Sequence, residues 1–223
     1  MRNYVIDHPD RINKKYFHKN FRHRRLCKRP YIVKLRRFLD DEEINAVLKM
    51  AEGKFKSSEI VVDGELVHST TRTSSTAFIT SNGHYNKCTR PVERILKKVC
   101  YLVGCKRSQI EGLMVVRYKE GEEYEDHHDY FDSEYLENPF DQGGQRIATF
   151  FCYLNNLPNK DGGGETEFPK LDISVSPSKG TGVFWWNVDK KGKTIDKTLH
   201  QGNVVKSGTK YGLNIWIREK IFG

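Results

Sequence analysis

Apolar side chains recur at helical spacing in two segments of the first half of the chain. In the first segment they stand three or four positions apart and predict a helix over residues 42–52, which Asp40 or Asp41 can cap. The second helix starts near Pro91, a residue type favoured in the first turn, and ends at Gly104, a residue type favoured after the last turn. The apolar stripes consist of Ile44, Val47, Leu48 and Ala51 in the first helix and of Ile95, Leu96, Val99, Leu102 and Val103 in the second.

From residue 113 onward the pattern changes to short runs of β-forming residues that are separated by turn residues. Such runs at short spacing are typical of a β-sandwich or barrel. We therefore predict a mostly β fold with helical backing: a double-stranded β-helix (jelly roll) whose N-terminal helices pack on one sheet. Residues 68–85, rich in Ser, Thr, Asn and Gly, predict turns and a long loop. The predicted strands are 113–118, 124–131, 146–154, 165–168, 182–186, 198–205 and 211–218.

Composition narrows the class of protein. Of the 223 residues, 37% are apolar and 12% aromatic, which is enough to build a hydrophobic core and excludes a wholly disordered chain. No apolar run reaches the roughly 18–20 residues of a membrane span, and residues 1–29 lack the apolar segment of a secretory signal. The five cysteines are scattered, which indicates reduced thiols rather than a disulfide framework. From these features we expect a cytoplasmic protein.

The net charge of +9 is concentrated at the N-terminus. Residues 1–29 hold ten of the 38 basic residues and two of the 29 acidic ones, so the rest of the chain is almost neutral. We therefore divide the chain into a basic N-terminal arm, 1–29, and one domain, 30–223, with a catalytic core at about 110–220. The run 18–25 could contact a polyanion or act as a nuclear address, and a solvated extension is the simpler alternative.

Residues 124–131, Tyr-Glu-Asp-His-His-Asp-Tyr-Phe, form the densest cluster of ligand-type side chains. Positions i and i+2 of a strand share a face, so His127 and Asp129 can hold one metal ion together. His200 is the best candidate for a third ligand. Two imidazoles and one carboxylate leave three coordination positions open, as in non-haem Fe(II) oxygenases. Zinc more often has four protein ligands, or three in a hydrolytic site with one open position. Taken alone, the His-x-Asp pair also fits ordinary histidines without a metal role.

The segment after His200 strengthens the metal hypothesis. If 206–208 form a hairpin loop with Gly208 in the left-handed position, His200 pairs with Asn214 and shares a face with Lys210. Lys210 would then lie roughly 13 Å along the sheet from His200. A five-carbon dicarboxylate chelated to the metal could span this gap and meet the Lys210 ammonium, although Lys210 alone also fits an exposed charge on an edge strand. The opposite face, toward the helices, would carry Tyr211, Leu213, Ile215 and Ile217.

On these residues the sequence resembles the prolyl 4-hydroxylase family of iron- and 2-oxoglutarate-dependent dioxygenases, of the collagen, plant and viral kind. The resemblance covers about residues 31–218. It rests on blocks in family order, namely 113–118, 121–131, 144–149, 153–155, 163–169, Phe184-Trp185 and the series His200, Lys210, Trp216. The chain departs from the family pattern on the substrate side, at Phe78 (often Trp), Val204-Val205 (often Pro-Val) and Arg218 (His in some relatives).

The resemblance implies a role for each of these residues. It implies that His127, Asp129 and His200 bind Fe(II). It also implies that Lys210 pairs with the distal carboxylate of 2-oxoglutarate. Further residues implied at the cosubstrate are Tyr153 and Thr149, beside Lys210, and Tyr118. The residues implied to line the peptide groove are Tyr124, Arg146 and Trp216, with Arg72 at the start of a loop that closes over the peptide.

The activity that the resemblance implies is 4-hydroxylation of peptidyl proline with O2 and 2-oxoglutarate, which releases succinate and CO2 and depends on ascorbate to keep the iron reduced. We expect a proline-rich or collagen-like substrate, because an extended polyproline II segment fits an aromatic groove. Two alternatives stay open. A related dioxygenase could act on another protein side chain or on nucleic acid, and a non-catalytic jelly-roll binding module would have the same fold.

Overall fold

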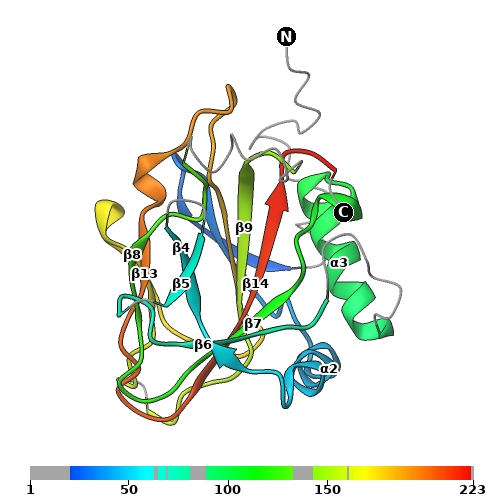
Figure 1. The fold of residues 1–223 in the computed structure, drawn as a ribbon. Coiled ribbons are helices and arrows are strands. Elements are labelled where there is room, and N and C mark those ends of the chain that lie inside the picture. The colour runs from blue at the N-terminus through cyan, green and yellow to red at the C-terminus, as the bar shows by residue number, and fades with distance from the viewer. Residues whose placement is uncertain are drawn as a thin grey trace.

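Two β-sheets packed on each other form the body of the molecule (Figure 1). The structure is a computed structural model and describes residues 21–62, 65–68, 70–80, 89–132, 143–159 and 161–221. The large sheet has the strand order β1 (Arg22–Cys27), β2 (Ile32–Arg36), β12 (Gly182–Trp186), β9 (Arg146–Tyr153), β14 (Lys210–Arg218), β7 (Met114–Tyr118), β6 (Ser75–Phe78) and β3 (Lys56–Ser57). The small sheet has the order β11 (Ile173–Val175), β10 (Thr166–Phe168), β13 (His200–Gly202) and β8 (Tyr124–His127), and a separate hairpin joins β4 (Glu59–Val62) to β5 (Glu65–His68).

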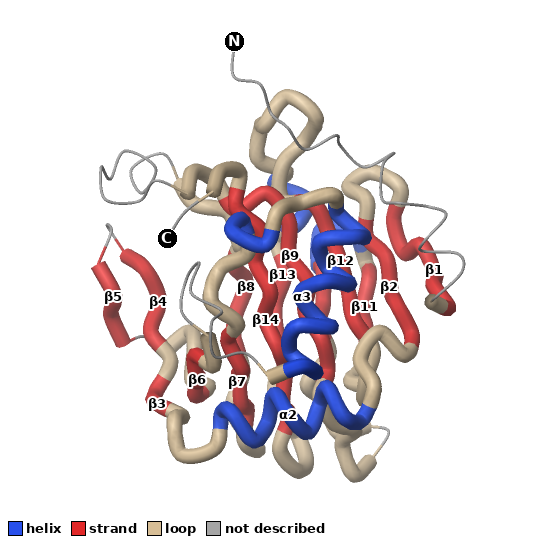
Figure 2. Tube along the Cα trace, turned by 90° about the vertical axis from the view of Figure 1, so that its right-hand side faces the viewer, coloured by secondary structure: helices blue, strands red, loops and turns tan. Residues whose placement is uncertain are grey.

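Helices α2 (Asp41–Ala51) and α3 (Arg90–Val103) lie across the outer face of the large sheet (Figure 2). Asp40 caps α2, because its Oδ1 accepts a hydrogen bond from the Glu43 N–H while the Glu43 carboxylate accepts one from the Asp40 N–H. Helix α3 ends at Gly104, whose φ of 76° is left-handed. Both helices lie where the sequence predicts them. Among the described residues, no helix is long and apolar enough to cross a membrane.

Alternation along the central strands separates two hydrophobic cores. In β9, Ala148, Phe150 and Cys152 pack in the core with the helices, whereas Phe151 and Tyr153 face the small sheet. A strand buried on both faces is expected where a sheet is covered by helices on one side and by a second sheet on the other. The predicted mostly β fold with helical backing is therefore confirmed. The helix-facing residues of β14 are also the predicted ones, Leu213, Ile215 and Ile217.

Some strands lie where the sequence predicted none. Strands β1 and β2 pair at one edge of the large sheet, so residues 22–27 belong to this sheet although they fall within the predicted arm. Strand β6 lies inside the predicted loop 68–85 and pairs with β7. Strand β1 is polar and β6 is short, and β2 and β6 are fixed by the distant strands β12 and β7, which a local pattern does not reveal. The rest of the arm, 1–20, lies outside the described residues.

The predicted hairpin between His200 and Lys210 is wrong. Strand β13 pairs with β8 and β10 in the small sheet, whereas β14 pairs with β7 and β9 in the large sheet. His200 therefore lies opposite His127 and not opposite Asn214. Gly208 does adopt the predicted left-handed φ, 83°, but it lies where the chain crosses between the sheets. His200 and Lys210 still point into the same space, because both line one cavity between the sheets.

Candidate active site

Three potential metal ligands converge between the two sheets. The pairing of β13 with β8 sets His200 opposite His127, and their ring centroids lie 4.2 Å apart. Oδ2 of Asp129 lies 3.6 Å from Nε2 of His200. One ligand atom from each of the three residues lies within 4.8 Å of the others. The structure therefore brings together the three residues that the sequence analysis names as ligands.

The strand that supplies two of these ligands is shorter than predicted. Strand β8 ends at His127, and Asp129 lies in the bend that follows. His127 and Asp129 therefore do converge, but Asp129 does so from a bend and not from the predicted strand. In this bend, the Asp129 carboxylate reaches Thr149 of the large sheet.

The hydrogen bonds of both histidines leave the same ring nitrogen free for a metal. Nδ1 of His127 lies 2.7 Å from the Glu125 carbonyl oxygen, and Nδ1 of His200 lies 3.0 Å from the Thr198 carbonyl oxygen. A carbonyl oxygen only accepts hydrogen bonds, so each Nδ1 carries the proton and each Nε2 has a lone pair. Backbone carbonyls commonly orient metal-binding histidines in this way. The donor set therefore fits Fe(II), with three positions left for other ligands.

A chain of hydrogen bonds fixes the orientation of the Asp129 carboxylate. Thr149 donates from Oγ1 to Oδ2 of Asp129 at 2.8 Å, and Asn187 donates from Nδ2 to the Thr149 oxygen at 3.0 Å. All three side chains are buried. Thr149 thus lies at the metal end of the cavity and not beside Lys210, as the sequence predicted. In the β9–β14 register Thr149 pairs with Trp216, four positions from the Gly212–Tyr153 pair.

The His127 ring packs on an aromatic neighbour, which itself packs against an arginine. It stacks on the Tyr124 ring at a centroid distance of 3.6 Å. The Arg72 guanidinium lies 4.7 Å from the Tyr124 ring centroid, and the backbones of Arg72 and Tyr124 form an isolated β-bridge. Burial and the neighbouring His200 lower the pKa of His127 well below its usual value. His127 is therefore neutral at physiological pH, as a metal ligand must be. Arg72 and Tyr124, both expected at the peptide groove, line the cavity.

Lys210 occupies the other end of the same cavity, which has a volume of about 550 Å³. Its side chain is 1% exposed, and the ammonium lies 4.7 Å from the ring centroid of Tyr118 and 5.3 Å from that of Phe151. Among the described residues, no carboxylate forms an ion pair with it. Burial lowers the pKa of Lys210 to about 7, against a smaller opposing effect of Glu165. A carboxylate bound here would restore the ammonium, so this end of the cavity fits the far carboxylate of 2-oxoglutarate.

Tyr118 and Tyr153, both expected near the cosubstrate, differ in what their hydroxyls can reach. Tyr118 lines the cavity, and burial raises its pKa to about 12, so the hydroxyl keeps its proton and can donate to an anion. The Tyr153 hydroxyl lies 2.6 Å from the Val175 carbonyl oxygen and 2.7 Å from the Thr166 hydroxyl, and burial raises its pKa further. Tyr153 therefore supports Thr166, and Thr166 rather than Tyr153 lines the cavity.

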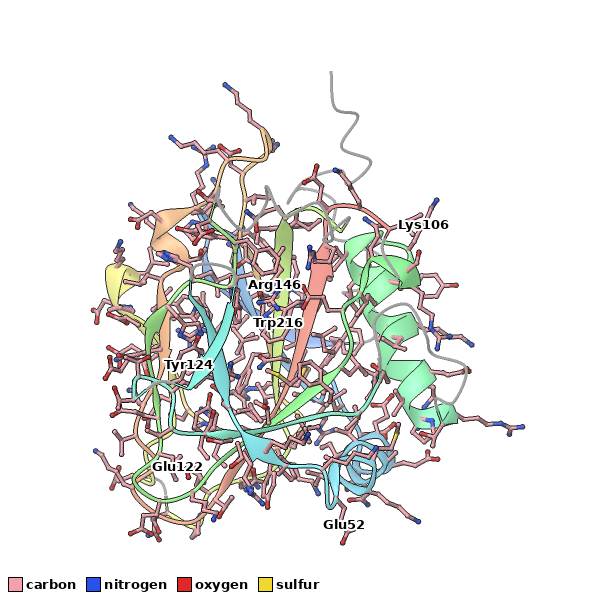
Figure 3. All side chains as sticks on the ribbon, in the orientation of Figure 1. Glu52, Lys106, Glu122, Tyr124, Arg146 and Trp216 are labelled. Carbon is pink, nitrogen blue, oxygen red and sulfur yellow. The ribbon has the colours of Figure 1, made fainter. Side chains whose placement is uncertain are left out.

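On the substrate side, two arginines share one buried carboxylate. Arg146 donates two 2.7 Å hydrogen bonds to Glu111, and Arg218 donates one of 3.0 Å. The Arg146 guanidinium also lies 3.9 Å from the Trp216 ring centroid, and Trp216 Nε1 is buried with no hydrogen-bond partner among the described residues. Figure 3 shows Tyr124 on the small-sheet side and Arg146 and Trp216 on the large-sheet side of the space between them.

Three further polar residues of this region are not evident from the sequence. Glu111 holds the arginine pair, Asn187 holds Thr149, and Thr166 lines the cavity beside Lys210. Asn187 had a signal, because it is a polar residue that directly follows an apolar strand ending in Trp185-Trp186. Glu111 and Thr166 are polar residues that no local pattern distinguishes from surface residues.

Comparison with known proteins places this geometry in a family. The family model described as the 2OG-Fe(II) oxygenase superfamily matches residues 113–218. Probable prolyl 4-hydroxylase 6 of Arabidopsis thaliana is 32% identical over 207 residues, which cover 83% of this chain and 68% of that protein. The human prolyl 4-hydroxylase subunit alpha-1 is 32% identical over 197 residues, which cover 86% of this chain and 35% of that protein. The viral collagen prolyl hydroxylase of Paramecium Bursaria Chlorella virus-1, in its 2OG complex, aligns at a TM-score of 0.64 and 31% identity over 86% of this chain and 98% of that one.

The chain belongs to the 2OG-Fe(II) oxygenase superfamily and, within it, to the prolyl 4-hydroxylase family. It is a dioxygenase that uses Fe(II) and 2-oxoglutarate. The donor set of the histidines and Asp129, with Lys210 at the far end of one cavity, agrees with this membership.

Proposed function

We propose that the protein hydroxylates peptidyl proline at the 4-position with Fe(II), O2 and 2-oxoglutarate, releasing succinate and CO2. The observation that carries the proposal is the single cavity that joins the His127, Asp129 and His200 ligand set to the Lys210 ammonium and opens on an arginine- and aromatic-lined groove. A cavity of about 550 Å³ accommodates a five-carbon dicarboxylate together with one substrate side chain.

The residues of the chain bind and orient the reactants. Bound Fe(II) supplies oxygen activation coupled to decarboxylation of 2-oxoglutarate. His127 and His200 present Nε2 toward the metal position, and Thr149 holds the Asp129 carboxylate in place. Lys210 neutralises the distal carboxylate of the cosubstrate, away from bulk water. This preorganised arrangement fixes the cosubstrate in one orientation before the peptide binds.

The substrate that best fits the groove is a proline-rich or collagen-like peptide. Tyr124, Trp216 and the exposed ring of Phe78, which is 61% exposed, all line the cavity. Aromatic grooves bind polyproline II segments well, because these segments are extended and ordered before binding. The Trp216 ring and the Arg146 guanidinium that packs over it both line the cavity on this side.

A panel of peptides tests the proposal. The full chain, loaded with Fe(II) and supplied with ascorbate and 2-oxoglutarate, is incubated with a collagen-like repeat, with other proline-rich peptides and with the same peptides carrying Ala for Pro. We expect one added oxygen on proline, with succinate formed in equal amount, and no product from the Ala peptides. The His127→Ala variant should be inactive but folded, because the residue is only partly buried. Oxidation of other side chains or of nucleic acid alone would reject the proposed substrate.

We also propose that the basic N-terminal segment contacts a polyanion, at a surface separate from the cavity. Strands β1 and β2 pair Arg22 with Arg36 and Arg24 with Lys34, so four cations share one face of a strand pair. Like charges directly opposite each other destabilise a sheet, and phosphates or carboxylates would relieve the repulsion. We expect steeply salt-dependent binding of a single-stranded oligonucleotide that is lost in the Arg22→Gln/Arg24→Gln variant. Binding that is insensitive to salt or to this variant would reject it.

A further inference from the structure

Cys100 and Cys105 flank the end of helix α3 and line the same small cavity, just before Lys106, which is labelled in Figure 3. The Gly104 N–H donates a 2.8 Å hydrogen bond to the Cys100 carbonyl oxygen, with Gly104 at a φ of 76°. This left-handed cap turns the chain back, so that the residue after the glycine packs on the helix residue whose carbonyl the glycine binds. Both residues of this pair are cysteines, and both line one small surface cavity.

The two thiols differ in exposure and in acidity. Cys100 is partly exposed, whereas Cys105 is only 8% exposed. The neighbouring Cys105 thiol and the charge of Arg107 lower the pKa of Cys100. The neighbouring Cys100 thiol and burial raise the pKa of Cys105 well above its usual value. The thiolate therefore forms on the accessible sulfur of the pair, as in a reactive dithiol.

A surface cavity of about 390 Å³ gives small molecules access to this pair. Cys100 and Cys105 both line it, as do Lys97 and Arg107, which make its surroundings electropositive, and Glu93. It shares no lining residue with the cavity that holds the metal ligands and Lys210. The pair is thus a chemically distinct site on the other side of the large sheet, with room for a reagent next to the thiolate.

We propose that Cys100 and Cys105 are a modification site that a small-molecule disulfide oxidises reversibly to an intramolecular disulfide. The Cys100 thiolate attacks one sulfur of the oxidant, which forms a mixed disulfide and releases one thiolate. Cys105 then gives up its proton and attacks the Cys100 sulfur, which breaks the mixed disulfide and releases the second thiolate. The pair loses two electrons and two protons, and the oxidant becomes two thiols, so the exchange is balanced.

The disulfide would close at the start of a short connection that leads to the peptide groove. Past Cys105, Gln109 donates hydrogen bonds of 3.2 and 3.1 Å to the Arg218 and Glu219 carbonyl oxygens. The Glu111 N–H then donates to the Trp216 carbonyl oxygen at 2.9 Å. Cys105 therefore lies six positions before Glu111, the residue that holds Arg146.

Titration with glutathione buffers tests the proposal on the full chain. Samples equilibrated at increasing ratios of oxidised to reduced glutathione are acid-quenched, alkylated and digested with trypsin. Both cysteines fall in one tryptic peptide, 99–106. We expect this peptide to lose two hydrogen atoms as the ratio rises and to regain them in reduced glutathione. Cys27, also partly exposed, serves as internal control and should stay reduced at ratios that fully oxidise the pair.

Variants assign the order of attack. Cys105→Ser should trap Cys100 as a stable glutathione adduct, Cys100→Ser should leave Cys105 unmodified, and Cys27→Ser should leave oxidation of the pair unchanged. The proposal is overturned if peptide 99–106 stays reduced at every ratio, or if Cys105→Ser gives no adduct. A cross-link from either cysteine to Cys88, which lies outside the described residues, would also overturn it.

Discussion

Thr149 donates a 2.8 Å hydrogen bond to Asp129, and this contact joins the central strand β9 to the bend that carries the metal-binding carboxylate. Thr149 in turn accepts a hydrogen bond from Asn187, so its hydroxyl both donates and accepts a hydrogen bond and its orientation is fixed. Outer hydrogen bonds of this kind hold a ligand in the orientation that the metal requires, and their loss typically weakens metal binding about 10–100-fold.

Replacing Thr149 with Val should therefore weaken iron binding while leaving the cosubstrate end intact. Val has nearly the same shape but donates no hydrogen bond, so Asp129 loses its partner in a buried site. We expect the Fe(II) concentration for half-maximal activity to rise about 10–100-fold. Tyr153→Phe, which removes a hydroxyl from the same strand, is the matched control and should leave this concentration unchanged. Equal Fe(II) requirements in the Thr149→Val variant and the native protein would contradict the assigned role.

The affinity for 2-oxoglutarate should depend on pH through Lys210. Its pKa of about 7 in the ligand-free protein means that the ammonium is half lost near neutral pH. The cosubstrate carboxylate binds the charged form, so affinity should be constant below about pH 6 and fall by about tenfold per pH unit well above pH 7. The Kd measured by calorimetry, with Mn(II) in place of Fe(II) to prevent turnover, gives the profile. Lys210→Met should bind weakly at every pH, and a pH-independent Kd in the native protein would contradict the assignment.

The same lysine should make the ligand-free protein more stable in mild alkali. Its folded pKa of about 7 lies below the unfolded value of about 10.4, so between these values the unfolded chain binds a proton that the native protein lacks. The free energy of unfolding should therefore rise with pH in this window. Urea titrations from about pH 7 to about pH 9.5 should show the native protein gaining stability relative to Lys210→Met. A constant difference between the two proteins would show that Lys210 is charged in the native state.

Strand parity and helix caps account for the part of this structure that the sequence predicts well. The side chains of β14 alternate as expected, and Asp40 and Gly104 bound the two helices, because these features depend on residues close in sequence. The pairing of β13 could not be derived in the same way. Alternation shows which residues share a face but not which sheet a strand joins, and His200 finds its partner His127 across 73 positions.

The functional residues also fall into two groups, those that the sequence reveals and those that only the fold reveals. Asp129 and Lys210 have charged side chains of types that are rarely buried, and His127 stands two positions before Asp129, so the sequence points to all three. Thr149 and Glu111 have common types, and their roles arise only from contacts with Asp129 and Arg146 that the fold creates. The resemblance to the family supplied a role for Thr149, but only the β9–β14 register shows that it lies at the metal end.

Glu111 should control the binding of the peptide and not that of the cosubstrate. Its carboxylate is buried and receives hydrogen bonds from both Arg146 and Arg218. Glu111→Gln keeps the shape but removes the charge, which frees Arg146 from its fixed position over Trp216. We expect the peptide KM to rise about tenfold or more, the effect of losing a charge-assisted contact, with the KM for 2-oxoglutarate unchanged.

A matched control separates this effect from a general loss of charge. Glu42→Gln removes an exposed carboxylate that pairs with Arg94 at 2.7 Å, on the helical side of the molecule. Both KM values should be unchanged in this variant, because exposed pairs contribute little. A rise in the 2-oxoglutarate KM of Glu111→Gln, or no rise in its peptide KM, would contradict the role of Glu111.

Gly202 provides a test of where the far carboxylate of 2-oxoglutarate binds. A Cβ at this position would lie 3.6 Å from the Lys210 ammonium and 3.7 Å from the Tyr118 hydroxyl, which are ordinary contact distances. Gly202→Ala should therefore fold normally but occupy space that a carboxylate on Lys210 requires, and Gly202→Val should occupy more. We expect the KM for 2-oxoglutarate to rise from the native protein to Ala and again to Val, while Fe(II) binding and the melting temperature change little. If both variants bind 2-oxoglutarate as the native protein does, the carboxylate lies elsewhere in the cavity.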